Sequence, residues 1–231
     1  MPFYSELPDL NNSVIMDLDN RKTLLIIFGG IAGHMGLPPF EFSKILTSIE
    51  TDKVFIRDVN QTWYQSGLPG ICNDFDGIKY FLDKLICKNN PSRVTFIGNS
   101  AGGFAAIALG HLLGIDKVVA FSPQTFITRW GRLFYLDRRW RTQIRNVYKH
   151  TRSNNYLDLK RILNISANVS ESIEIHYCSN HRLDKKHAER LIHINRVNLV
   201  SYHYGDHSLV KHLKDNGKLL NILKRSVSST D

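Results

Sequence analysis

Ser100, Asp184 and His207 are the residues of this 231-residue chain whose types and order could support nucleophilic chemistry. A serine hydroxyl is a poor nucleophile unless a base removes its proton, and the base must in turn be oriented by an acid. Ser100 lies in the stretch Gly98-Asn99-Ser100-Ala101-Gly102, which fits the pattern G-x-S-x-G. This pattern is typical of a sharp strand-to-helix turn that holds a serine hydroxyl above a sheet. It predicts acyl transfer through a covalent intermediate on the serine.

The residues on either side of Ser100 favour such a turn. An apolar stretch, residues 94–98, precedes it, and a run of small residues that is typical of a closely packed helix follows it. A glycine-rich corner could instead hold a phosphate, but this one lacks the Lys-Ser/Thr pair of a P-loop and the G-x-G-x-x-G spacing of a dinucleotide site. A purely structural turn is the remaining alternative.

The base and the acid are expected after the serine, with the acid first and the histidine last. His207 follows the last predicted strand and opens a helix, whereas His203 falls inside the strand and His212 inside the helix. Asp184 follows the preceding strand and is the predicted acid. It could also be a simple helix N-cap, which is a common position for aspartate. Asp206 competes for the acid's role, but adjacent side chains rarely form the acid–imidazole hydrogen bond.

The remaining predicted site residues lie in loops at the ends of two earlier strands. The backbone N–H of Ala101 and that of Gly30 or Ile31 are expected to form the oxyanion hole, although Gly29-Gly30 could also be an ordinary glycine turn. The loop over residues 57–70 carries polar and aromatic side chains that could line an acyl or sugar pocket, or could pack on a neighbouring segment. Those predicted substrate-binding residues are Trp63, Tyr64 and Gln65.

Short apolar runs alternate with helical patterns along the whole chain, which predicts a mostly parallel α/β sheet flanked by helices. The predicted strands cover residues 23–28, 53–57, 93–98, 117–121, 173–178 and 197–203. The predicted helices cover residues 40–49, 75–87, 100–113, 184–194 and 207–223. We expect residues 13–18 to pair with strand 23–28 through the turn at 19–22. We expect these elements to form one domain over residues 1–231.

About fifty residues separate the fourth main strand from the fifth, far more than such a connection needs. Residues 124–163 are predicted to be a mostly helical, cap-like insertion over the carboxyl end of the sheet, with a surface helix pair as the alternative. Ten Lys or Arg lie between Phe121 and Ile162, opposed only by Asp137 and Asp158. The whole chain carries a net charge of +9. This charge could indicate an acidic binding partner, or it could belong to a soluble basic surface without a binding role.

The composition limits the class of protein further. We predict no transmembrane segment, because no apolar run approaches 18 residues, and no signal peptide. Three widely spaced cysteines indicate a reducing compartment, so a cytoplasmic location is expected. No metal is expected, because His176, Cys178, His181 and His187 do not form a compact ligand motif.

The chain resembles the α/β-hydrolase superfamily in "FGG" at 28–30, "GNSAGG" at 98–103, "LDKKHA" at 183–188 and "GDHSLVKHL" at 205–213. It also resembles small hydrolases of bacterial glycan and surface-polysaccharide clusters. The resemblance implies Ser100 as nucleophile, Asp184 as acid and His207 as base, with no cofactor. It departs from lipases, because the HGGG segment is missing and the insertion is too basic for a lipase lid.

Three functions fit these observations. The first is a serine esterase that cleaves a small-molecule or glycan ester, which could be anionic. The second is an O-acyltransferase that uses the same triad to move an acyl group from CoA to a sugar hydroxyl. The third is a non-catalytic module that binds an anionic surface or nucleic acid through Arg129 to Arg161 of the basic insertion. No sequence-specific nucleic-acid site is predicted.

Overall fold

A computed structural model of the chain describes residues 9–10, 12–31, 40–151, 155–165 and 172–227. Its eight-stranded sheet has the order β1-β2-β4-β3-β5-β6-β7-β8. The strands are β1 (Asp9–Leu10), β2 (Val14–Asp17), β3 (Thr23–Phe28), β4 (Asp52–Ile56), β5 (Arg93–Asn99), β6 (Lys117–Phe121), β7 (Ser172–Cys178) and β8 (Val197–Tyr202). The helices are α1 (Ser43–Leu46), α2 (Phe75–Asn89), α3 (Ala101–Leu113), α4 (Arg129–Tyr135), α5 (Arg141–His150), α6 (Leu159–Leu163), α7 (Arg182–Glu189), α8 (Leu209–Asp215) and α9 (Lys218–Val227).

The mostly parallel α/β prediction is confirmed. The six strands from β3 to β8 run parallel, and only the pairings of β1 and β2 are antiparallel. The predicted helix over residues 207–223 is two helices, because Gly217 between them has φ +67, which an uninterrupted helix does not allow. The predicted helix over 40–49 is a single turn, α1.

The expected pairing of residues 13–18 with strand 23–28 is wrong. β2 pairs antiparallel with β4, and β3 lies between β4 and β5. The turn that leaves β2 is held to the start of β4, because the Asp52 carboxylate accepts the backbone N–H groups of Asp19 and Arg21. Both edges of β3 are therefore taken by parallel neighbours.

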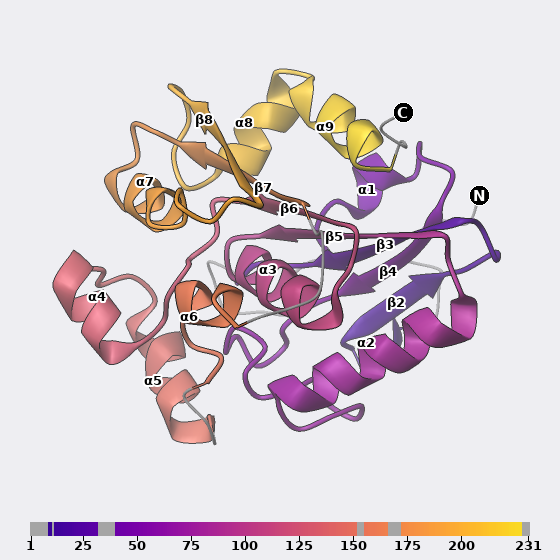
Figure 1. Cartoon of the computed structure of the whole chain (residues 1–231), viewed down its shortest axis with the longest axis horizontal. Helices are drawn as coiled ribbons and strands as arrows, with labels where there is room; N and C mark the ends of the chain where they lie inside the picture. The colour runs from indigo at the N-terminus through magenta and orange to yellow at the C-terminus, as the bar shows by residue number, and fades with distance from the viewer. Residues whose placement is uncertain (1–8, 11, 32–39, 152–154, 166–171, 228–231) are drawn as a thin grey trace.

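Helices cover the two faces of the sheet (Figure 1). α2 and α3 lie on one face, and α1, α8 and α9 lie on the other. Each face buries its own apolar cluster, with Phe28 and Phe96 in the first and Phe55 and Phe121 in the second. Both faces of the central strands are apolar for this reason, as expected for a parallel sheet.

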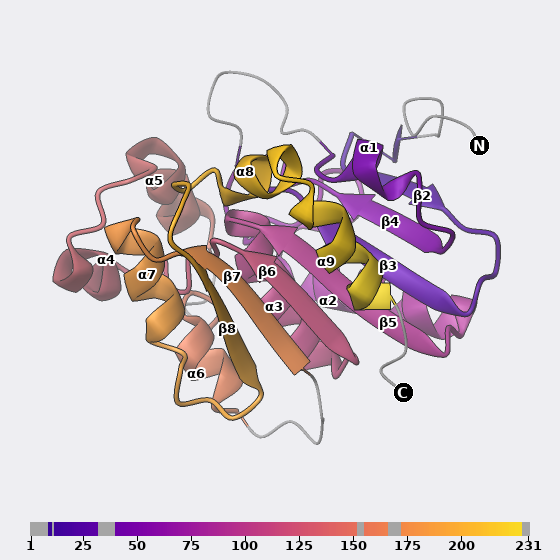
Figure 2. The ribbon, with the colours of Figure 1, turned by 90° about the horizontal axis from the view of Figure 1, so that it is seen from above.

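The insertion after β6 contains the helices α4, α5 and α6, so its predicted helical character is confirmed. It leaves and returns through a short two-stranded neck, where the Ile127 N–H donates to the Leu157 carbonyl and the Leu159 N–H donates to the Thr125 carbonyl, both at 2.9 Å. Figure 2 shows α4 and α5 beyond the carboxyl ends of β6 and β7. Its role as a cap stays a prediction.

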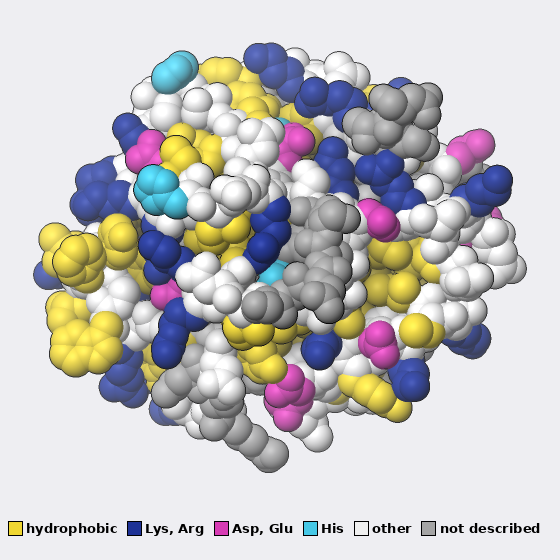
Figure 3. Space-filling view, viewed as in Figure 1, with side chains coloured by type: hydrophobic (Ala, Val, Ile, Leu, Met, Phe, Trp, Pro, Cys, Tyr) yellow, Lys and Arg dark blue, Asp and Glu magenta, His cyan; other side chains and the backbone are white. Residues whose placement is uncertain are grey.

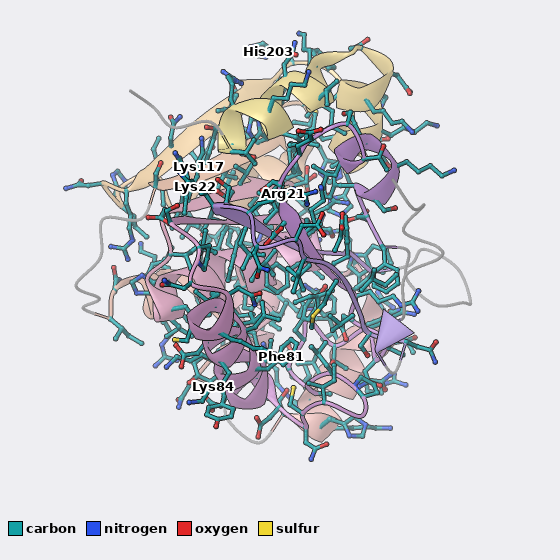
Figure 4. All side chains as sticks on the ribbon, turned by 90° about the vertical axis from the view of Figure 1, so that its right-hand side faces the viewer. Arg21, Lys22, Phe81, Lys84, Lys117 and His203 are labelled. Carbon is teal, nitrogen blue, oxygen red and sulfur yellow. The ribbon has the colours of Figure 1, made fainter. Side chains whose placement is uncertain are left out.

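The opposite edge of the sheet faces the viewer in Figure 4. The labelled Arg21, Lys22 and Lys117 lie there, where β3 and β6 begin. None of the helices that the structure describes is long and apolar enough to cross a membrane.

Candidate active site

Ser100 lies at the corner between β5 and α3, with φ 52 and ψ −115. Few residues other than glycine adopt such backbone angles, and strain of this kind concentrates at functional sites. Two flanking glycines make the corner possible. A Cβ on Gly98 would overlap the carbonyl of Gly102, and a Cβ on Gly102 would overlap the carbonyl of Phe28 at the end of β3. The predicted sharp turn is therefore present, and the serine side chain is nearly buried within it.

The structure brings together the three residues that the sequence predicted as a triad. Ser100 Oγ lies 3.0 Å from His207 Nε2. His207 Nδ1 lies 2.9 Å from Asp184 Oδ2 and 3.0 Å from Oδ1. The imidazole can therefore donate from Nδ1 to the carboxylate and accept the serine proton at Nε2. Asp184 reaches His207 from the first turn of α7. The N-cap of α7 is His181, so the N-cap alternative for Asp184 is wrong.

Asp184 is a buried carboxylate with several partners. Burial would raise the pKa of Asp184, but the hydrogen bonds to His181 and His207 hold it well below its usual range. Arg139 also donates from Nη1 to Asp184 Oδ1 at 2.9 Å. The acid is therefore ionised at neutral pH, as an orienting partner of His207 must be.

Arg139 connects the basic insertion to this acid. Its guanidinium also contacts Asp137, with Nε 3.0 Å from Oδ1 and Nη2 2.8 Å from Oδ2. Asp137 Oδ2 lies 3.1 Å from Nε2 of His187 on α7. Burial lowers the pKa of His187. The loop between α4 and α5 is thus fixed to α7 by a buried polar cluster of Asp137, Arg139, Asp184 and His187.

Gln124 is a site residue that the sequence analysis did not single out. Its Oε1 accepts the indole N–H of Trp63 at 3.1 Å, and because that N–H can only donate, the amide orientation is set. Gln124 Nε2 then lies 2.9 Å from Ser100 Oγ and 3.3 Å from His207 Nε2. A donor is therefore held beside both reacting atoms. The sequence held one signal that could have identified Gln124. This residue lies just past the carboxyl end of β6, two residues beyond Ser122.

The predicted substrate-binding residues do not line the cavity beside Ser100. Trp63 and Tyr64 are 0% exposed. The Tyr64 hydroxyl donates to the carbonyl of Gly29, and Gln65 Nε2 donates to the carbonyl of Tyr156 at the base of the insertion. These side chains therefore pack on neighbouring segments, which was the alternative interpretation of the sequence. They support the site without lining its cavity.

The predicted oxyanion-hole residues surround Ser100, but one donor is already engaged. Ala101 is the first residue of α3, and a Cβ on Gly30 would lie 3.5 Å from the Cβ of Ser100. The Gly30 N–H donates to Glu41 Oε2 at 3.0 Å, and Asn99 donates to Glu41 Oε1 at 2.8 Å. Burial raises the pKa of Glu41, although the hydrogen bonds from Asn99 and Gly30 oppose that shift. A carboxylate therefore competes for the predicted Gly30 donor.

A cavity of about 500 Å³ lies against Ser100 and His207. Ile31 and Trp140 contribute to its walls, and Trp140 Nε1 is buried with no hydrogen-bond partner in the described structure. Lys211 and Lys214 from α8 also line it. The cavity can hold a small acyl group and presents positive charge to an anionic portion of a substrate.

Among the described residues, one cluster has the donor atoms of a metal site: His181, Asp184 and His207. The Arg139 guanidinium is bonded to Asp184, and a fixed cation there disfavours a metal ion. The four residues of the sequence-based metal alternative do not converge, because His176 bonds Tyr202 and His187 bonds Asp137. The donors therefore fit a triad better than a metal centre.

No family profile and no curated protein sequence matches this chain. Solved structures share its fold at 12–15% identity. The capsule O-acetyltransferase of Neisseria meningitidis serogroup A is 14% identical, with a TM-score of 0.67 over 91% of this chain and 90% of that one. A fluorophosphonate-binding serine hydrolase of Staphylococcus aureus is 12% identical, with a TM-score of 0.61 over 94% and 91%.

An esterase of Pyrobaculum calidifontis is 13% identical, with a TM-score of 0.58 over 93% of this chain and 79% of that chain. The chain therefore has the α/β-hydrolase fold that its motifs resembled. Likeness at this level of identity concerns the fold.

Proposed function

We propose that this protein is a serine esterase that cleaves a small ester through an acyl-enzyme on Ser100. The observation that carries the proposal is the continuous hydrogen-bonded line from Ser100 Oγ through His207 to Asp184, with distances of 3.0 and 2.9 Å. This arrangement is that of a nucleophile, its base and an orienting acid. The strained backbone at Ser100 agrees with it.

The steps follow from the positions of the atoms. Ser100 Oγ attacks the acyl carbon while its proton passes to His207 Nε2, and the oxyanion is held by the N–H of Ala101 with Gly30 or Ile31. His207 then gives the proton to the departing alkoxide oxygen as the C–O bond breaks. Water repeats the sequence on the acyl-enzyme, which releases a carboxylic acid and the free serine. Gln124 Nε2 is placed to donate to the attacking or departing oxygen.

The test is fluorophosphonate labelling together with turnover of p-nitrophenyl acetate. Ser100→Ala and His207→Ala should abolish labelling, and Asp184→Asn should lower turnover by about 10⁴-fold because the imidazole loses its orienting charge. His203→Ala, which changes a histidine outside the triad, is the matched control and should behave like the unchanged protein. Negligible labelling and equal turnover in all five proteins would refute the proposal.

An O-acyltransferase is the second candidate. Two observations favour it: Lys211 and Lys214 line the cavity, and a capsule O-acetyltransferase, of which a histidine variant was solved with CoA, shares the fold. Lysines can contact phosphates of an acyl donor. Acetyl-CoA with oligosaccharide acceptors should then give acetylated sugar faster than free acetate, and Lys211→Gln with Lys214→Gln should raise the KM for acetyl-CoA. If acetate forms equally fast without an acceptor, hydrolysis is the reaction.

A further inference from the structure

The short helix α4 exposes a cluster of large apolar side chains. Trp130 is 81% exposed, Phe134 80%, Leu133 64% and Leu136 58%, and α4 contains no buried residue. Large apolar side chains gathered in this way on one element mark an interaction site more often than chance. Figure 3 shows hydrophobic side chains at the left edge of the molecule, where Figure 1 places α4.

Exposed cations lie on α4, on α5 and in the loop between them, and four of them line one pocket. These cations are Arg129, Arg138, Arg141, Arg145 and Lys149. The two acids of the insertion do not oppose them at the surface, because Asp137 is buried against Arg139 and Asp158 is paired with Arg190 at 2.8 Å. The surface of the insertion is therefore apolar at α4 and positively charged around it.

The cluster is close in sequence to residues of the candidate active site. Arg139 and Trp140 follow the end of α4 within five residues. Arg139 bonds Asp184, and Trp140 lines the cavity beside Ser100. Figure 2 shows α4 at the same edge of the sheet as α7, which carries Asp184. A surface that α4 contacts would therefore face the region of the cavity.

We propose that α4 and the exposed arginines around it dock the protein on an anionic lipid surface. Trp, Phe and Leu side chains flanked by Arg and Lys are the composition of helices that lie in the membrane interface. Anionic headgroups complement the exposed cations. A second copy of this chain would bring the same cations against each other, and the aliphatic Leu133 and Leu136 suit acyl chains better than nucleic-acid bases.

The proposal goes beyond the proposed function and can be tested without catalysis. Ser100→Ala protein is sedimented with vesicles of phosphatidylcholine alone or with about one third phosphatidylglycerol. We expect binding to the anionic vesicles that weakens steeply as salt is raised. Trp130→Ala with Phe134→Ala should lower the bound fraction about tenfold, and Arg138→Gln with Arg141→Gln should do so as well.

Matched controls lie on α2, away from α4. Tyr80→Ala removes an aromatic side chain that is 65% exposed, and Lys84→Gln with Lys88→Gln removes two charges. Figure 4 labels Lys84 at the bottom of α2. Both controls should bind as the Ser100→Ala parent does.

Three results would overturn the proposal. The first is no binding to anionic vesicles by protein that melts cooperatively. The second is equal binding by the α4 variants and their α2 controls. The third is self-association of the parent that the Trp130→Ala, Phe134→Ala protein loses while vesicle binding is unchanged, which would assign α4 to contacts between copies. All of these experiments use Ser100→Ala protein, so their results do not bear on the esterase proposal. The labelling experiment tests that proposal separately.

Discussion

Arg139→Gln is the substitution that tests how the basic insertion affects the candidate triad. The Arg139 side chain contacts Asp184 at 2.9 Å and Asp137 at 2.8 Å, and both carboxylates are almost fully buried. Glutamine keeps a hydrogen-bond donor but removes the positive charge. The same change at the neighbouring Arg138, which is exposed, is the control.

One magnitude follows from these contacts. Removing one partner of a buried ion pair costs about 3–5 kcal/mol of the free energy of unfolding. We expect the lower end of that range, because His187 still contacts Asp137, and His207 still contacts Asp184.

The same contact has a direct consequence for labelling. Arg139 holds Asp184 Oδ1, the oxygen that also lies 3.0 Å from His207 Nδ1, so without Arg139 the acid and the imidazole are positioned less tightly. Because small displacements of catalytic groups cost about 10- to 100-fold in rate, the labelling rate of Arg139→Gln protein should fall by that order. The assay is the fluorophosphonate labelling rate, measured on protein shown by its thermal melt to be folded. An unchanged rate in folded Arg139→Gln protein would refute this reasoning, as would an equal fall in Arg138→Gln.

Three further substitutions test other parts of the structure. Gly102→Ala should lower the free energy of unfolding by about 3 kcal/mol or more in a urea titration, because its Cβ would overlap the carbonyl of Phe28. Glu41→Ala should raise kcat/KM for p-nitrophenyl acetate about tenfold by removing the acceptor that occupies the Gly30 N–H, and no change would mean that Gly30 does not hold the oxyanion. Burial raises the pKa of Asp58 to about 6. The native state therefore keeps a proton that the unfolded chain releases above about pH 4, so the free energy of unfolding should fall by about 3 kcal/mol as pH rises from about 4 to 6. Asp58→Asn should flatten that slope in urea titrations across this range.

Local patterns in the sequence were enough to predict the parallel sheet and the order of the site residues. Apolar runs of five to seven residues mark strands that are covered on both faces, and their carboxyl ends meet at one edge. Ser100, Asp184 and His207 each follow a strand of this parallel sheet, so their convergence was predictable from position alone.

Long-range contacts decided what the local patterns could not. The partner of β2 depended on Asp52, which lies more than thirty residues from the turn that it holds. Gln124, Arg139 and Glu41 carry no local motif, and their positions beside the triad arise only when loops from separate elements pack together.

The sequence by itself determined the fold class, the strained corner at Ser100 and the identity of the residues that could act as base and acid, because these depend on periodicity, glycine placement and chain order. The tertiary structure alone decided that Trp63 and Tyr64 are buried, that the Gly30 N–H is engaged by Glu41, and that Arg139 reaches Asp184. The physical reason is that burial and pairing of side chains depend on which surfaces meet in space. Neither is encoded in the neighbours of a residue along the chain.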